Sequence, residues 1–272
     1  MITADDLIGL IRAYNPSTNV ALITKAYNFC CEMHDGQIRR SGEPYYTHPL
    51  AVACLLADQQ LDDASIITAL LHDTIEDTKA KYTDVEELFS HEIAELVDGV
   101  TKLTNLQLSS TVNKQAENFR KLIMATSKDI RVTLVKVADR LHNMRTIRSM
   151  SPEKQQQKAR ETMDIYAPLA GRMGMHWLRE ELEDLAFQVL NPEGRQSIIR
   201  RFIKLQNETG DVVEQIKGDL LKEMAGEGIL SEIQGRAKKP YSIWRKMQTK
   251  ELSFSRLSDI YGFRLIVDDE AD

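Results

Sequence analysis

The sequence predicts a helical domain that is followed by the start of an α/β segment. In the first two-thirds of the 272 residues, apolar residues recur at helical spacing between residues that favour helix ends. Residues 191–194, Asn-Pro-Glu-Gly, interrupt this pattern. After Gly228, short segments rich in β-branched and aromatic residues begin, and Tyr261–Val267 is the clearest of them. We therefore expect two regions, residues 1–190 and residues 191–272.

The first region contains start signals for several helices. Thr47 is a good N-cap, and Pro49 follows in the first turn, where a missing N–H costs little. A capping box begins a helix at Thr83, and Ser151 with Pro152 begins another. The expected helices cover residues 20–34, a segment from Thr47, residues 64–78, a segment from Thr83, residues 130–144 and a segment from Ser151.

Residues 130–144 show the helical period most clearly. The spacing is four, three, four and three positions between Ile130, Leu134, Val137, Leu141 and Met144. Such spacing places these side chains on one stripe of a helix. We expect an amphipathic helix that turns this stripe toward the core.

The second region begins with two amphipathic stretches, which are separated near Gly210, and Gly226 and Gly228 end the second. A strand over 232–239, a short helix over 240–250 and a buried strand over Tyr261–Val267 are expected to follow. Two strands do not form a stable domain by themselves. The segment therefore looks like the beginning of an α/β domain that this chain does not finish.

Composition and charge argue against several classes of protein. The formal net charge of −6 disfavours sequence-independent binding to nucleic acid. No segment approaches the ~20 apolar residues of a membrane helix, and the N-terminus lacks the features of a signal peptide. Cys30, Cys31 and Cys54 form no C-x-x-C pair, which fits reduced thiols. We expect a cytoplasmic protein without membrane or nucleic-acid contacts. Arg39 and Arg40 could bind a small anion, although such a pair is usually a solvated loop.

Residues 72–77 place four polar side chains on one side of an expected helix. His72 and Glu76 are four residues apart, as are Asp73 and Asp77, so each pair shares a face. Because this helix is rich in apolar residues, the polar sector must lie beside the core, where carboxylates need a cation or hydrogen-bond donors. Imidazole together with carboxylate favours Mn²⁺, Fe²⁺ or Zn²⁺ over Ca²⁺. The pattern therefore indicates a metal site.

Further polar residues fit the same site. Asp139 and Asn143 share a face of the expected 130–144 helix, and His48 lies in the first turn of its own helix. Each has a simpler explanation: Asp139 could be an edge residue, His48 a cap, and a lone His-Asp pair is most often a surface or structural feature. The combination favours the metal site. A structural or surface role is expected for the histidines without a carboxylate partner at ligand spacing, which are His34, His91, His142 and His176.

Three long motifs make the sequence recognisable. Residues 39–50 are R-R-S-G-E-P-Y-Y-T-H-P-L, residues 70–78 are L-L-H-D-T-I-E-D-T, and residues 135–146 are V-K-V-A-D-R-L-H-N-M-R-T. In this order and spacing they resemble the hydrolase domain of the RelA/SpoT homologue family, and residues 235–259 resemble the start of its synthetase domain. The resemblance implies an all-α HD-type phosphohydrolase domain, followed by a partial α/β nucleotidyltransferase-like segment.

The resemblance also implies roles for particular residues. One Mn²⁺ ion would be bound by His48, His72, Asp73 and Asp139. The attacking water would be positioned and activated by Glu76 and Asp77. The guanine nucleotide would be held by Arg39, Arg40, Ser41, Asn143 and Thr146. A partial synthetase site would have a Mg²⁺ ligand in Asp259 and phosphate-binding groups in Arg236, Lys238, Ser242 and Lys246.

The activity that the resemblance implies is Mn²⁺-dependent removal of pyrophosphate from the 3′ position of ppGpp and pppGpp, in stringent-response signalling. Relatives with an inactive hydrolase domain have the Glu-Asp pair replaced, whereas Glu76 and Asp77 are intact here. Arg40 stands where the family often has lysine, which keeps the charge but could alter contact with the base. Synthesis, which would need Mg²⁺, is not expected, because a second acidic residue from a later strand does not occur before Asp272. Ribosome contact is expected only through regions that this chain lacks.

Two other functions fit part of the pattern. A generic HD phosphodiesterase or nucleotidase would use the same metal ligands, but it does not require the arginine-containing loop at residues 39–50. A nucleotide-sensing regulatory module would keep the metal site for stability alone. Release of pyrophosphate in the presence of Mn²⁺ would distinguish the hydrolase from both.

Overall fold

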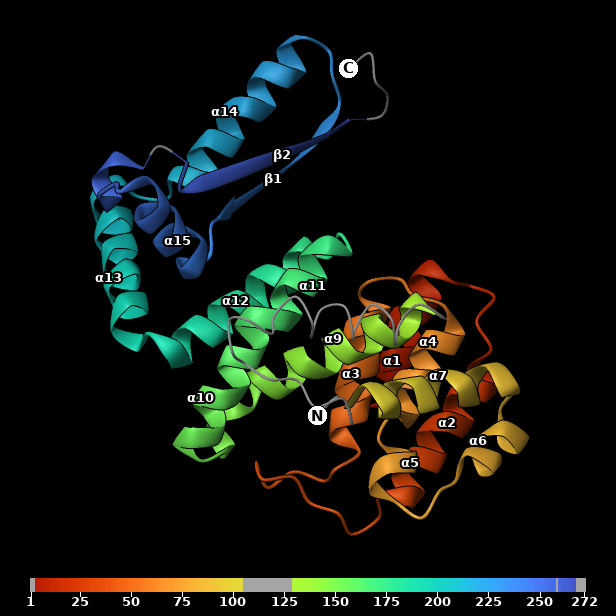
Figure 1. Cartoon of the computed structure of the whole chain (residues 1–272). Coiled ribbons are helices and arrows are strands. Elements are labelled where there is room, and N and C mark those ends of the chain that lie inside the picture. Colours follow the sequence, from red (N-terminus) through yellow and green to blue (C-terminus); the bar gives the residue numbers. More distant parts are fainter. Residues whose placement is uncertain (1–2, 105–128, 258, 268–272) are drawn as a thin grey trace. The chain divides into compact units, whose positions relative to one another are not determined.

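The computed structural model of the protein describes residues 3–104, 129–257 and 259–267. The chain forms two compact units, Met1–Leu182 and Glu183–Asp272. Figure 1 shows helices in the first unit, and helices with a two-stranded sheet in the second, which confirms the predicted fold class. The units divide within helix α12 (His176–Leu190), whereas the sequence placed the boundary after residue 190.

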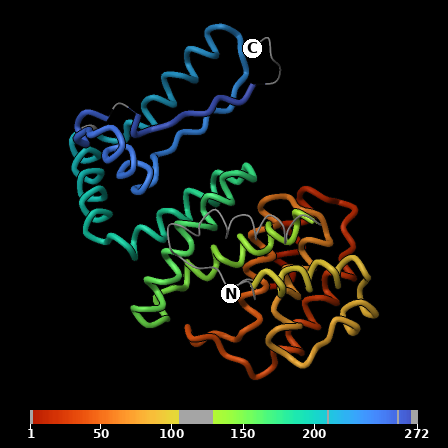
Figure 2. The backbone as a smooth tube through the Cα atoms, viewed as in Figure 1, coloured from red at the N-terminus to blue at the C-terminus, as the bar shows by residue number. Residues whose placement is uncertain are grey.

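The first unit packs around three helices. Helices α3 (Thr47–Ala57), α4 (Asp63–Leu71) and α9 (Ile130–Arg145) contact one another. Figure 2 shows the backbones of α3 and α9 side by side. Among its described residues, this unit also has helices α1 (Ala4–Tyr14), α2 (Val20–Met33), α5 (Thr74–Asp77), α6 (Tyr82–Leu88), α7 (His91–Thr104), α10 (Pro152–Glu161) and α11 (Ala167–Arg172), with a 3₁₀ turn η2 (Ile147–Ser149) and a π-helical segment η3 (Thr162–Tyr166). Among the described residues, no helix is long and apolar enough to cross a membrane.

Helix α9 is more deeply buried than its apolar stripe predicted. Every residue from Val135 to Leu141 is buried, including Lys136, Asp139 and Arg140. The prediction of a single buried stripe is wrong, because α9 contacts α3, α4, α7 and η3 and therefore has packing partners on more than one side. The outer end of the stripe, Ile130, is 61% exposed.

The helix predicted over residues 64–78 is interrupted. Helix α4 ends at Leu71, His72 and Asp73 form a turn, and α5 begins at Thr74. Side chains here bond to the backbone: His72 Nδ1 lies 2.8 Å from the Ala69 carbonyl, and Thr74 Oγ1 donates to the Leu71 carbonyl at 2.6 Å. Such bonds compete with the helical ladder. The break places His72 and Asp73 between α4 and α5, in a turn whose backbone stays in the right-handed helical region.

Two predicted helix starts are displaced. Thr47 is the first residue of α3, and its hydroxyl donates to the Pro44 carbonyl at 2.7 Å instead of capping the helix. Helix α6 begins at Tyr82, where the Asp84 carboxylate accepts the Lys81 N–H at 2.8 Å. A short polar side chain in the first turn therefore matters more here than the S/T-x-x-E pattern.

The second unit contains the end of α12, then α13 (Pro192–Thr209), α14 (Val212–Gly226), β1 (Ser231–Ala237), α15 (Pro240–Lys250), a 3₁₀ turn η4 (Phe254–Arg256) and β2 (Tyr261–Val267). Strands β1 and β2 are antiparallel, with Gly235 opposite Phe263. A Cβ atom on Gly235 would lie 2.7 Å from Val213 Cγ1 and 2.8 Å from the Phe263 ring, so glycine permits the close packing of α14 on the sheet. The core of this unit is formed by Ile198, Ile243, Phe254, Leu257 and Ile260.

The interruption at residues 191–194 is a helix corner. Asn191 caps α13 through its side-chain oxygen, which accepts the Gly194 N–H at 2.9 Å, and the chain turns there in Figure 2. Strand β2 has the predicted bounds, but the prediction that it is buried is wrong. Leu265 is 40% exposed and Ile266 is 43% exposed, because β2 pairs only with β1 among the described strands.

Candidate functional site

Three buried side chains from distant parts of the sequence meet in the first unit. His48 lies in the first turn of α3, His72 follows the end of α4, and Asp139 lies in α9. One ligand atom of each lies within 4.8 Å of the others. Asp139 Oδ1 is 3.1 Å from His48 Nε2 and 3.9 Å from His72 Nε2. Two imidazoles and a carboxylate in this arrangement form a candidate site for a divalent transition-metal ion.

Asp73 adds a second carboxylate to the cluster. Its Oδ1 is 3.1 Å from His72 Nε2, and its Oδ2 is 3.7 Å from His48 Nε2. The Asp73 side chain is 15% exposed, so this carboxylate lies at the open side of the cluster. The structure therefore brings together all four residues that the sequence resemblance proposed as ligands.

His72 shows what kind of atom the cluster presents. Its Nδ1 lies against the Ala69 carbonyl, which can only accept a hydrogen bond, so Nδ1 has a hydrogen, and in the neutral ring Nε2 has the lone pair. His72 Nε2 is buried, has no hydrogen-bond partner and faces the carboxylates of Asp73 and Asp139. A buried lone pair beside two carboxylates is unfavourable unless a cation lies between them. The donor set therefore fits a metal ion.

His142, for which the sequence predicts a structural or surface role, belongs to the same network. Its Nδ1 is 2.8 Å from His48 Nδ1 and 3.0 Å from an Arg39 guanidinium nitrogen. Burial, His48 and Arg39 lower the pKa of His142 to about 3, so this ring is neutral at physiological pH. Its partners come from other elements, so ligand spacing within α9 does not indicate this network.

A buried lysine orients the Asp139 carboxylate. Lys136 Nζ donates to Asp139 Oδ2 at 2.6 Å, one turn earlier on α9. Burial disfavours the charged form of both side chains, but the attraction between them is stronger than this effect. The charge of Asp139 therefore raises the pKa of Lys136. Lys136 and His48 hold the pKa of Asp139 well below its usual range. Because Lys136 occupies Oδ2, Asp139 presents Oδ1 to the two imidazoles.

The predicted water-activating residues lie beside this cluster. Tyr45 is the link, because its hydroxyl is 2.9 Å from Asp73 Oδ2 and 2.8 Å from Asp77 Oδ2. Its single proton serves one carboxylate at a time, and burial with Asp73 raises the pKa of Tyr45, so it remains a donor. Partial burial also raises the pKa of Glu76, and the charge of Lys136 opposes that rise. Glu76 and Asp77 are both exposed.

The predicted nucleotide-binding loop is a tight hairpin before α3. The Arg39 N–H donates to the Glu43 carbonyl at 2.8 Å, and Gly42 adopts a φ of +90°, which favours glycine. The Arg39 side chain points to α9, where it also donates to Asn143 Oδ1 at 3.0 Å. Arg40 and Ser41 are exposed, so only Arg39 of these three reaches α9 in the structure.

The two predicted nucleotide-binding residues at the end of α9, Asn143 and Thr146, form hydrogen bonds within the protein. Asn143 Nδ2 donates to Asp139 Oδ1 at 2.5 Å, which connects it directly to the metal cluster. The Thr146 hydroxyl donates to the His142 carbonyl at 3.2 Å. Asn143 therefore lies between Arg39 and Asp139, and Thr146 lies one turn farther along the chain.

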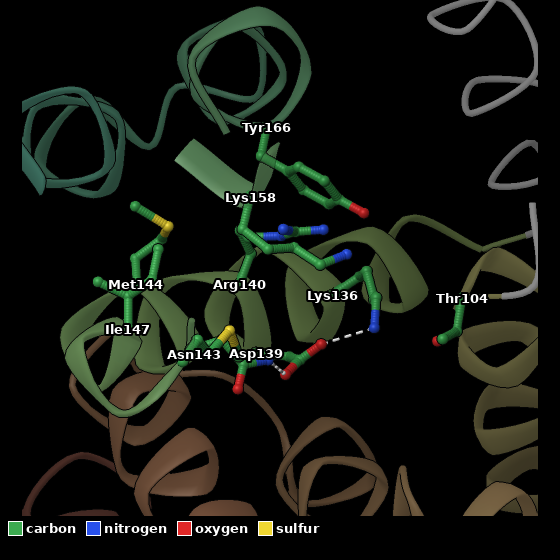
Figure 3. A pocket seen from close by; sticks show the side chains of 10 residues that line it. Thr104, Lys136, Asp139, Arg140, Asn143, Met144, Ile147, Lys158 and Tyr166 are labelled. Atoms are coloured by element: carbon green, nitrogen blue, oxygen red, sulfur yellow. Dashed lines mark hydrogen bonds and ion pairs between the residues drawn. The ribbon is translucent and has the colours of Figure 1, made fainter. Parts of the chain in front are cut away.

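A pocket of about 220 Å³ opens beside Asp139. Figure 3 shows Lys136 and Asn143 bonded to Asp139 on its floor, with Arg140, Lys158 and Tyr166 above them. Three of the lining residues, Lys136, Arg140 and Lys158, have cationic side chains. The pocket therefore offers positive charge directly beside the candidate metal ligands. Its complete lining is Thr104, Lys136, Asp139, Arg140, Asn143, Met144, Ile147, Met150, Lys158 and Tyr166.

Two of these cations are held by one carboxylate. Glu161 accepts from Arg140 at 3.2 Å and from Lys158 at 3.1 Å. The Arg140 guanidinium also lies over the Tyr166 ring, 4.1 Å from its centroid. Tyr166 ends the π-helical segment η3, and π-helical turns occur often at functional sites. Sequence spacing does not predict the contacts of Arg140 with Glu161 and Tyr166. The i, i+3 spacing of Lys136 and Asp139, in contrast, does indicate that these two residues can pair.

The predicted synthetase residues form a separate cluster in the second unit. Asp259 Oδ2 is 2.6 Å from Lys238 Nζ, and Asp259 Oδ1 is paired with Lys246. These hydrogen bonds hold the pKa of Asp259 well below its usual range. Arg236 lies exposed on β1, and Ser242 lies in the first turn of α15. The structure thus joins Lys238, Lys246 and Asp259 of the five predicted residues.

Two known protein families match parts of this chain. Residues 26–176 match the HD domain, which includes all the candidate metal ligands. Residues 235–272 match a region found in RelA and SpoT proteins, which includes Lys238, Lys246 and Asp259.

Curated relatives agree with these matches. A protein of Brucella ovis named GTP pyrophosphokinase rsh is 49% identical over 272 residues, which is 100% of this chain and 36% of the relative. A protein of Escherichia coli O157:H7 named guanosine-3′,5′-bis(diphosphate) 3′-pyrophosphohydrolase is 46% identical over 270 residues, covering 99% of this chain and 38% of the relative. The chain thus spans little more than a third of the length of these relatives.

A solved structure of a metazoan ortholog of SpoT, described as hydrolysing ppGpp, is 24% identical and covers 65% of this chain and 96% of its own. Its TM-score of 0.40 is too low to support an argument about fold or activity. The family matches are sufficient without it: this chain belongs to the HD domain family, and its HD domain is joined to a region found in RelA and SpoT proteins, which confirms the resemblance to the RelA/SpoT homologues.

Proposed function

We propose that this chain hydrolyses the 3′-pyrophosphate of ppGpp and pppGpp, releases pyrophosphate with GDP or GTP, and requires Mn²⁺. The observation that best supports the proposal is the shared position of Asp139. One of its oxygens faces the imidazoles of His48 and His72, while the other bonds Lys136 on the floor of a cationic pocket. The names of the relatives, one of which is a 3′-pyrophosphohydrolase, support this choice of substrate.

The proposed ion would be held by His48, His72, Asp73 and Asp139. When bound, a divalent ion supplies charge that neutralises phosphoryl oxygens and lowers the pKa of a coordinated water. Mn²⁺ accepts imidazole and carboxylate together, whereas Mg²⁺ prefers oxygen ligands and water. His72 offers a lone pair for this purpose, because the Ala69 carbonyl fixes its hydrogen on Nδ1.

The protein's own groups would move the proton and hold the phosphates. Glu76 and Asp77 are the candidates to accept the proton of the attacking water. Partial burial raises the pKa of Glu76, which makes it a stronger base than a fully solvated glutamate, and the charge of Lys136 opposes that rise. Lys136, Arg140 and Lys158 line the pocket and would bind the pyrophosphate oxygens.

The nucleoside would be oriented from the loop and from α9. Arg39, Arg40 and Ser41 approach from the hairpin, and Asn143 and Thr146 from the end of α9. Arg39 and Asn143 already contact each other at 3.0 Å, which supports one binding face made by both elements. These groups need only position the substrate, because the chemistry takes place at the 3′ phosphates.

We do not expect this chain to synthesise ppGpp from ATP and GDP. That reaction would require Mg²⁺ at Asp259, whose two oxygens are both paired with lysines. A cytoplasmic location and the expected lack of nucleic-acid or ribosome contacts stay predictions from the sequence.

The proposal is tested by identifying products. The purified chain with Mn²⁺ and ppGpp should give GDP and pyrophosphate in equal amounts, measured by ion-exchange chromatography. A generic phosphodiesterase would instead cleave cyclic or simple nucleotides with equal or higher kcat/KM. A regulatory module would bind ppGpp without releasing pyrophosphate. Either result would contradict the proposed activity.

A further inference from the structure

We propose that Arg39 and His142 are positioning residues that fix the hydrogen of His48 on Nδ1, so that His48 Nε2 presents a lone pair to the metal ion. This inference rests on the metal site of the proposed function. It assigns a role to His142, and it gives Arg39 a task that is independent of nucleotide binding.

The geometry begins at His142 Nδ1, which has two neighbours. An Arg39 guanidinium nitrogen lies 3.0 Å away, and His48 Nδ1 lies 2.8 Å away. An arginine side chain has only donors, so the Arg39 contact requires His142 Nδ1 to be an acceptor. An acceptor nitrogen has no hydrogen, and the hydrogen between the two imidazoles must therefore belong to His48.

The opposite end of the His48 ring follows from this assignment. With the hydrogen on Nδ1, the neutral ring has its lone pair on Nε2. That atom is 3.1 Å from Asp139 Oδ1 and 3.7 Å from Asp73 Oδ2, on the side where the ion would lie. Groups that bond the far nitrogen of a ligating histidine commonly fix its tautomer and its orientation.

The two imidazoles of the site are thus fixed by different means. The Ala69 carbonyl in α4 fixes the hydrogen of His72 on Nδ1, and that bond does not depend on any other side chain. His142 in α9 and Arg39 in the hairpin loop together fix the hydrogen of His48 on its Nδ1. The same Arg39 guanidinium donates to Asn143, which donates to Asp139. Arg39 therefore stabilises the arrangement of two candidate ligands, His48 and Asp139, from outside the metal site.

The first test measures Mn²⁺ affinity of the nucleotide-free chain, by electron paramagnetic resonance of free Mn²⁺. Arg39→Ala should weaken binding by about tenfold or more, in the range of losses for groups that orient metal ligands. Arg40→Ala is the matched control, because Arg40 is the exposed neighbour in the same loop. A residue that only contacts nucleotide would leave Mn²⁺ affinity unchanged when substituted.

His142 is tested with a conservative pair of variants. His142→Phe keeps a planar ring but removes the acceptor, and it should weaken Mn²⁺ binding by about tenfold to a hundredfold. His142→Gln keeps an acceptor oxygen and should recover much of the affinity. His91→Phe is the control, since the His91 side chain is 73% exposed on α7.

A direct readout is the protonation of each ring nitrogen. In the Zn²⁺-loaded chain with ¹⁵N-labelled histidine, long-range ¹H–¹⁵N spectra distinguish nitrogens with and without hydrogen. We expect His48 with its hydrogen on Nδ1, His142 with a bare Nδ1, and a scalar coupling between these two nitrogens across the hydrogen bond.

Each outcome decides between the proposals. A hydrogen on His142 Nδ1, together with unchanged Mn²⁺ affinity in His142→Phe, would overturn the positioning role while the metal site stands. Failure of the unaltered chain to bind either ion would overturn this role and the proposed metal site together. Loss of affinity in Arg39→Ala but not in Arg40→Ala, with a bare His142 Nδ1, would establish the positioning role.

Discussion

Asp139 and Asp259 are both aspartates bonded to lysine, yet they occupy opposite kinds of environment. The Asp139 side chain is 6% exposed, and one lysine, Lys136, bonds one of its oxygens. The Asp259 side chain is 42% exposed, and lysines occupy both of its oxygens. A single buried lysine leaves Asp139 Oδ1, which also accepts from Asn143, directed at two imidazoles, whereas lysines contact both oxygens of Asp259.

This difference shows why a carboxylate alone does not make a metal site. Among the residues that the structure describes, His48, His72 and Asp139 are the group of side chains placed to hold an ion. They are buried, so their lone pairs are not satisfied by water, and a cation would relieve that cost. Asp259 has cations already and no such requirement.

Substitution of the two aspartates should therefore have unequal effects on activity. Asp139→Asn is expected to lower pyrophosphate release by at least about a hundredfold and to weaken Mn²⁺ binding, because it removes an ionised ligand. Asp259→Asn should leave both unchanged. Initial rates with ppGpp and Mn²⁺ titrations of each variant provide the measurement. Equal losses in the two variants would contradict the comparison.

Metal binding and chemistry should separate at the neighbouring carboxylates. Glu76→Gln and Asp77→Asn keep the side-chain shape but remove a proton acceptor, so kcat should fall by about a hundredfold or more while Mn²⁺ stays bound. Single-turnover rates beside Mn²⁺ titrations would show this. If turnover is unchanged in both variants, neither residue takes part in the proton transfer.

The lysines should differ in their contribution to stability. Lys136→Met in the metal-free chain leaves Asp139 buried without its partner, which should cost about 3–5 kcal/mol of unfolding free energy. Lys238→Met should cost less than about 1 kcal/mol, since its partner is exposed and keeps a second lysine. Urea unfolding measures both values. Added Mn²⁺ should restore part of the loss in Lys136→Met only, and a comparable loss in Lys238→Met would argue against the comparison.

The smallest effect is expected for synthesis. Incubation with ATP, GDP and Mg²⁺ should give no ppGpp above background, and Asp259→Asn should not alter that result. Thin-layer chromatography of radiolabelled nucleotides is a sufficient assay. Formation of ppGpp would show that Asp259 can exchange its lysines for Mg²⁺ and that its environment is not as closed as we infer.

Local sequence signals predicted most of the fold. The bounds of α15 and β2 agree with the prediction because proline starts one and a run of β-branched and aromatic residues forms the other. The break after Leu71 was not predicted, since it depends on bonds of His72 and Thr74 to the backbone. The sequence also did not predict the burial of α9 on several sides, because that burial depends on which helices pack around it.

The candidate site was likewise predicted where motifs identify its residues and missed where the contacts depend on the fold. Motif likeness proposed His48, His72, Asp73 and Asp139, and the structure brings them together. Lys136, Tyr45 and His142 were missed as functional neighbours, although each lies inside a recognised motif. Their partners come from other elements or through burial, and no spacing rule connects a hairpin arginine to a histidine about a hundred residues later.

We propose that one ion held by His48, His72, Asp73 and Asp139 enables release of the 3′-pyrophosphate. The most direct measurement is a titration of the metal-free chain with Mn²⁺ in the presence of ppGpp, following bound Mn²⁺ and pyrophosphate release in the same samples. Activity should rise in proportion to bound Mn²⁺, reach a plateau at one ion per chain, and disappear with a chelator, and Mg²⁺ should restore less activity than Mn²⁺. Full pyrophosphate release in the presence of chelator, or one bound Mn²⁺ per chain without any release, would contradict this proposal.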